Sequence, residues 1–173
     1  MKSRDWLASG TFRALGPILA LATLVHPGFA AADDDHSGWS LNFTPVLFLP
    51  TDEYGIGGGV DPEVKYTLDL GATRLSGGAR VGGYYVKDRL AVIAMPTLRL
   101  LVPVGPVEPY AAFGLGYGWI PKAGNEDVAT MSRLGFVVRF SESFAIGIEG
   151  AIQTIGGSNF RFGSFGSMVS FDL

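Results

Sequence analysis

From residue 39 to the C-terminus, apolar side chains recur at every second position in one segment after another. In the segment 60–70, for example, Val60, Val64 and Leu68 alternate with Glu63 and Lys65. Because successive side chains of a β-strand point to opposite faces, this period predicts strands with one apolar and one polar face. No run of about 18 apolar residues occurs in this part of the chain, so we predict no transmembrane helix there.

Eight such segments follow one another, at 39–49, 60–70, 75–85, 90–100, 107–119, 133–140, 144–153 and 164–173. The short connections 71–74, 103–106 and 141–143 alternate with 51–59, 86–89, 120–129 and 154–159, three of which are longer. Short turns at one end, longer loops at the other and strands near the ~9–11 residues that span a membrane are typical of outer-membrane barrels. We therefore predict an all-β fold, an eight-stranded antiparallel up-and-down transmembrane β-barrel.

The two faces of the predicted strands differ in charge and in side-chain size. The apolar face carries no charge, and small residues such as Gly82, Gly114 and Gly135 are frequent on the opposite face. A narrow eight-stranded lumen requires small side chains, whereas a solvent-exposed face does not. This favours a membrane barrel with a polar interior over a soluble, lipocalin-like barrel with an apolar one.

We expect the charged residues of the polar face to form an interior charge network, because isolated charges in a confined space are costly. These residues are Glu63, Lys65, Asp69, Arg80, Arg99, Glu108, Arg133, Arg139, Glu149 and Asp172.

Aromatic residues lie near the ends of the predicted strands, where a membrane barrel carries an aromatic girdle at each interface. One rim would hold Trp39, Phe140, Phe144 and Phe171, and the other Tyr85, Tyr117, Trp119 and Phe160. Ordinary core packing is the alternative interpretation of these rings.

The N-terminal region has the features of a secretory signal. Basic residues precede an apolar run at 14–25, and small residues follow at 28 and 30–32. We predict a signal peptide at 1–32, cleaved after Ala30 or Ala32, then a periplasmic linker at 33–38 and the barrel at 39–173. A membrane anchor is less favoured, because the apolar run is short and contains Pro17.

The stretch Val107–Trp119, VEPYAAFGLGYGW, together with the signal peptide and the eight segments, resembles the small outer-membrane β-barrel proteins of the OmpA/OmpX/OmpW type. The resemblance implies a Gram-negative outer membrane, periplasmic termini, and contact with membrane lipid and lipopolysaccharide. It also implies that the barrel-assembly machinery reads the C-terminal strand. That strand ends in the alternating sequence Val169–Leu173, with Leu173 in the place of the family's usual aromatic residue.

The chain offers few groups for chemistry. It has no cysteine and two histidines, of which only His36 follows the signal region. The segment 147–159 faintly resembles the active strand of lipid A deacylases, but no histidine precedes Ser158 and Asn159. We therefore predict no catalytic residues, no metal site and no cofactor. The net charge of −3 argues against a nucleic-acid partner.

The sequence thus favours a non-catalytic outer-membrane protein with a lumen filled by side chains, serving envelope integrity or surface interaction. The alternatives are a narrow channel for small compounds, hydrophobic ones among them, and a lipid A-modifying enzyme.

Overall fold

The computed structural model describes residues 37–49, 56–86, 89–121, 124–156 and 160–173. The signal peptide predicted at 1–32 and the linker residues 33–36 lie outside the described residues. Among the described residues, no helix is long and apolar enough to cross a membrane.

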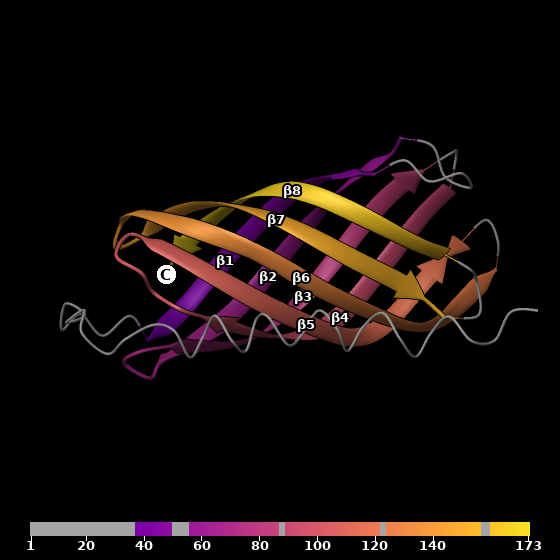
Figure 1. The fold of residues 1–173 in the computed structure, drawn as a ribbon. Coiled ribbons are helices and arrows are strands. Elements are labelled where there is room, and N and C mark those ends of the chain that lie inside the picture. Colours follow the sequence, from indigo (N-terminus) through magenta and orange to yellow (C-terminus); the bar gives the residue numbers. More distant parts are fainter. Residues whose placement is uncertain (1–36, 50–55, 87–88, 122–123, 157–159) are drawn as a thin grey trace, which may run out of the picture. The chain divides into compact units, whose positions relative to one another are not determined.

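Eight antiparallel strands form one closed barrel, as the sequence predicted (Figure 1). Each strand pairs with its neighbours in the chain, and β8 also pairs with β1. The strands are β1 (Gly38–Phe48), β2 (Gly58–Asp69), β3 (Arg74–Val86), β4 (Arg89–Leu101), β5 (Val107–Ile120), β6 (Asn125–Ser141), β7 (Phe144–Ile155) and β8 (Phe160–Asp172).

The first and last strands close the barrel along their length. Leu41 pairs with Phe171 and Leu47 with Phe165, and the Leu173 amide donates to the Trp39 carbonyl at 2.9 Å. Because every strand has two partners, the sheet has no open edge. Closure is the condition under which strand backbone groups can be buried in hydrocarbon.

The strand β6 is longer than predicted. The sequence pattern predicted a loop at 120–129, but β6 begins at Asn125 and pairs from there with Ile120 of β5. The outward residues Thr130 and Ser132 are polar and interrupt the apolar alternation. Strand β7 likewise continues to Ile155. The loops predicted at 120–129 and 154–159 are therefore shorter, and the predicted asymmetry of loop length is wrong for these two connections.

Burial alternates along the strands in the predicted sense, with polar residues inside. In β2, Asp61, Glu63 and Lys65 are buried, while Val60 and Val64 are exposed. Every strand contributes exposed apolar side chains to the outer face, for example Leu41, Val64, Val81, Leu98, Phe113, Leu134, Ile148 and Phe165.

The two neighbouring glycines of β3 show how narrow the lumen is. A Cβ atom added to the inward Gly82 would lie 2.2 Å from the Tyr84 hydroxyl and 2.3 Å from an Asp61 carboxylate oxygen. A Cβ added to the outward Gly83 would meet nothing within 4 Å. The small residues on the polar face therefore make room for large side chains from other positions.

Candidate functional site

The lumen is the candidate functional site, and it has two distinct ends, a terminal end and a loop end. The terminal end holds the start of β1, the end of β8 and the connections 70–73, 102–106 and 142–143. The loop end holds the other four connections. From the loop end to the terminal end, the interior changes from apolar to ion-paired to hollow.

An aromatic plug fills the lumen near the loop end. It consists of Phe48 from β1, Tyr84 from β3 and Phe162 from β8, whose ring centroids lie 4.5–5.5 Å apart. Buried aliphatic side chains such as Ile93 and Met131 belong to the same apolar cluster. Tight packing of this kind is expected in an eight-stranded barrel, whose interior is just wide enough for side chains to fill it.

A central charge cluster lies next to the plug. Its members form one continuous series of ion pairs in the order Arg99, Glu63, Arg133, Glu149, Arg80 and Asp61. Glu63 lies 2.6 Å from Arg99 and 2.7 Å from Arg133. Glu149 lies 3.2 Å from Arg133 and 3.5 Å from Arg80, which also pairs with Asp61. Each of the six side chains is at least 98 % buried.

Neutral hydrogen-bonding groups complete the coordination of the buried carboxylates. Thr97 donates to Glu63 at 2.7 Å, and the Tyr110 hydroxyl donates to Glu149 at 2.6 Å. The Tyr84 hydroxyl contacts Asp61, which connects the charge cluster to the aromatic plug. Such a network is favourable because removing charges from water is costly unless their hydrogen bonds are replaced.

A second group, the rim cluster, surrounds the lumen at the terminal end. Arg74 lies 2.9 Å from Asp69 and also pairs with Glu108. Arg139 lies 3.2 Å from the same Glu108 and pairs in addition with Asp172. The rim cluster therefore joins side chains of strands β2, β3, β5, β6 and β8.

The structure places nine of the ten predicted charged residues in these two clusters. The tenth, Lys65, belongs to neither. Sequence reasoning missed Asp61 and Arg74. Asp61 lies on the polar face of its segment, so the alternation contained the signal needed to find it. Arg74 was assigned to a turn, so the alternation did not indicate whether its side chain faces the lumen or the outside.

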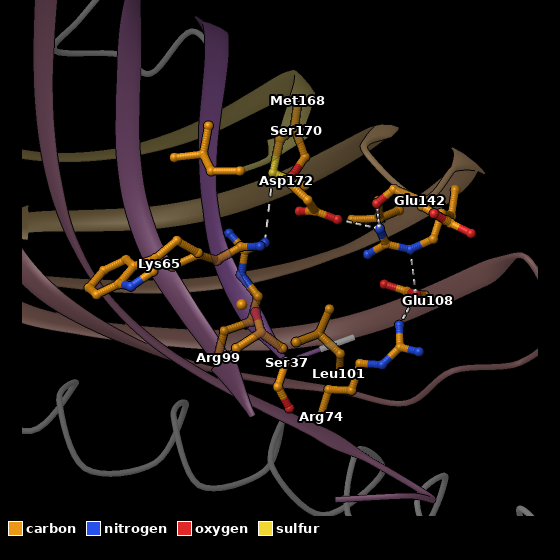
Figure 2. Close-up of a pocket in the computed structure, with 16 residues that line it drawn as sticks. Ser37, Lys65, Arg74, Arg99, Leu101, Glu108, Glu142, Met168, Ser170 and Asp172 are labelled. Atoms are coloured by element: carbon orange, nitrogen blue, oxygen red, sulfur yellow. Dashed lines mark hydrogen bonds and ion pairs between the residues drawn. The ribbon is translucent and has the colours of Figure 1, made fainter. Parts of the chain in front are cut away.

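A cavity of about 310 Å³ lies at the terminal end of the lumen. Figure 2 shows its lining, in which Lys65 and Arg99 lie on one side and Arg74, Glu108 and Glu142 on the other. The lining includes Lys65, Thr67, Arg99, Arg139, Ser170 and Asp172. Among the described residues, no group of three or more histidine, cysteine, aspartate or glutamate side chains has a geometry suited to a metal ion.

The predicted girdle residues occupy both ends of the outer surface. At the terminal end Trp39, Phe140 and Phe171 are exposed, and the half-buried Phe144 ring lies between Phe140 and Phe171, with centroids 6.2 and 5.6 Å away. At the loop end the exposed rings are Tyr85, Tyr117 and Trp119. The side chain of Phe160 lies outside the described residues.

The sequence matches no protein-family model and no curated protein. Solved structures nevertheless share its fold. Neisserial surface protein A superposes with a TM-score of 0.56 at 12% identity, over 80% of this chain and 97% of that one. Ail, the attachment invasion locus protein of Yersinia pestis, gives a TM-score of 0.53 at 12% identity, over 79% of this chain and 97% of that one.

The N-terminal β-barrel domain of Pseudomonas aeruginosa OprF gives a TM-score of 0.52 at 13% identity, over 78% of this chain and 99% of that domain. The chain thus has the fold of the small eight-stranded outer-membrane barrels.

Proposed function

We propose that this protein is a non-catalytic component of a Gram-negative outer membrane, with a barrel closed by its own side chains and a role in envelope integrity or surface interaction. The observation that carries this proposal is the central charge cluster. Its six ion-paired side chains extend between strands on opposite sides of the lumen, next to the aromatic plug.

The outer surface supports the membrane location. Apolar side chains cover all eight strands, while the charges of the central cluster are buried. A charged side chain facing lipid at mid-depth would cost about 2–4 kcal/mol, so an exterior of this kind suits hydrocarbon. We infer that membrane lipid and lipopolysaccharide surround the barrel, and that the girdle aromatics lie at the two interfaces.

The proposal includes the route to the membrane. Residues 1–32 would direct export and be removed, and residues 33–38 would lie in the periplasm together with the C-terminus. The barrel-assembly machinery would recognise β8, whose outward Phe165, Val169 and Phe171 keep the alternating pattern.

A closed lumen predicts that the protein does not conduct. Water and ions could cross only if the Glu63 and Glu149 pairs separated and the plug moved, and breaking a buried ion pair is strongly unfavourable. The purified barrel, inserted into planar bilayers, should therefore give no steady conductance steps, whereas an open porin in the same bilayers does. The different gel mobility of boiled and unboiled samples checks that the purified barrel is folded.

Steady ohmic steps would contradict the closed lumen and favour the narrow-channel alternative. Mass spectrometry of lipid A from expressing cells tests the enzymatic alternative. We expect an unchanged acyl pattern, and a change that depends on the expressed protein would overturn the non-catalytic proposal.

A further inference from the structure

We propose that the cavity at the terminal end of the lumen is a binding site for a small anion bearing a carboxylate or phosphate group, with the Lys65 ammonium as its principal contact. This site adjoins the closed region on which the proposed function depends, and it shares Arg99 with the central charge cluster.

Lys65 is a buried cation without a carboxylate partner among the described residues. Its side chain lines the cavity, and the residue is only 7% exposed. The ammonium donates to the Ser40 hydroxyl at 2.9 Å, and no other hydrogen bond or ion pair of this group occurs within the described part of the chain. An ammonium has three donors, so two remain for another acceptor.

The neighbouring carboxylates are already engaged. Glu63, two residues away on the same face, accepts hydrogen bonds from Asn42, Thr97, Arg99 and Arg133. Asp172, which also lines the cavity, pairs with Arg139 in the rim cluster. A counter-ion for Lys65 would therefore have to come from outside the described residues.

Arg99 provides a second set of unsatisfied donors at the same cavity. Its Nη2 binds Glu63, but its buried Nε has no partner among the described residues. Its Nη1 lies 3.8 Å from the Met168 sulfur, which is a weak acceptor. Two buried cationic groups on one cavity wall are suited to an anion, because charge-assisted hydrogen bonds are stronger than neutral ones.

The remaining lining limits the class of ligand. The lining carries the cationic side chains of Lys65, Arg74, Arg99 and Arg139 and the anionic side chains of Glu108, Glu142 and Asp172. Thr67 and Ser170 add hydroxyl groups to the wall. A volume near 310 Å³ is at the lower end of the range for small-molecule sites, about 300–1,000 Å³. The cavity therefore fits a small anionic solute.

The experiment measures the unfolding temperature of the purified barrel in non-ionic detergent. Inorganic phosphate or acetate replaces chloride at constant ionic strength, so that general salt effects stay fixed. We expect at least one of the two anions to raise the unfolding temperature by several degrees in a saturable way. Comparing phosphate with acetate then shows whether the site prefers a phosphate or a carboxylate group. The rise should be lost in Lys65→Met and kept in Arg161→Met, an exposed residue near the start of β8 at the loop end.

The absence of a saturable rise with both anions, or an equal rise in Lys65→Met, would overturn the proposal.

A second measurement on the unaltered protein does not depend on a variant that folds. Acylation of lysines by an amine-reactive ester, followed by peptide mass spectrometry, should be at least about twofold slower at Lys65 when the stabilising anion is present. Lys87 and Lys122 should react at unchanged rates, and unchanged reactivity of Lys65 would also contradict the site.

Discussion

Glu63 accepts hydrogen bonds from side chains of three other strands, and it joins the two arginines on which much of the central charge cluster depends. Arg99 and Arg133 lie on β4 and β6, and both bind this one carboxylate. Asn42 of β1 donates to it at 3.2 Å. The residue thus connects strands that are not neighbours in the sheet.

Replacement of Glu63 by glutamine should therefore destabilise the barrel strongly. Glu63→Gln keeps the shape but leaves two buried guanidinium groups without their shared anion, and breaking a buried ion pair costs about 3–5 kcal/mol. The free energy of unfolding in lipid vesicles, measured by urea titration and tryptophan fluorescence, gives the loss. Glu142→Gln, in the exposed β6–β7 turn, is the control and should change stability by less than about 0.5 kcal/mol. Equal effects of the two variants would contradict the role assigned to the cluster.

At the residue scale, the sequence predicted which charges lie inside but not how they pair. The alternation of apolar and polar residues assigns each residue to the lumen or to the outer face. It assigns Glu63, Arg99 and Arg133 to the lumen. It contains no information on which residues meet across the lumen. Glu63 and Arg133 are 70 positions apart and meet only because the sheet closes. That Lys65 has no carboxylate partner among the described residues could not be predicted for the same reason, since it depends on how Glu63 and Asp172 are engaged across the lumen.

The strands were predictable wherever apolar residues on one face alternate with polar or small residues on the other. In β2 this alternation is continuous, and the predicted segment 60–70 differs from the observed strand by two residues at its start and one at its end. In β6 the alternation is clear only from Leu134 onward, because the outward Thr130 and Ser132 are polar. These hydroxyl-bearing residues still support a strand, and Thr130 forms a hydrogen bond of 2.7 Å with Thr154 of β7.

The free-energy cost of a charge on the outer face of a strand should depend on how deep the position lies in the membrane. Leu98, in the body of β4, is 56% exposed and pairs with Phe113 of β5, while Leu70, just after β2, is 60% exposed. Leu98→Arg would place a charge in hydrocarbon and should destabilise the barrel by about 2–4 kcal/mol. Leu70→Arg, at similar exposure but at the interface, should cost only about 0–1 kcal/mol. Unfolding in lipid vesicles measures both, and equal losses would contradict the lipid-facing assignment.

The whole barrel has two unlike ends, which gives the proposed membrane orientation a structural basis. At the terminal end, the ion-paired rim and the hollow cavity lie beside both ends of the described chain, and the connections at 70–73 and 142–143 are tight. At the loop end, the plug closes the lumen and the connection 49–57 is longer. Barrels of this fold place short turns in the periplasm and longer loops outside.

The absence of cysteine from the chain allows this orientation to be tested with single introduced thiols. Glu126→Cys places an exposed thiol near the start of β6 at the loop end, and Ser143→Cys places one in the exposed turn at the terminal end. A membrane-impermeant maleimide added to intact cells should label Glu126→Cys, because the loop end would face the exterior. It should label Ser143→Cys only after the outer membrane is permeabilised, and the cysteine-free protein controls for background. The reverse pattern would mean that the cavity opens to the outside, and that the anion which Lys65 lacks would have to come from the medium rather than from the periplasm.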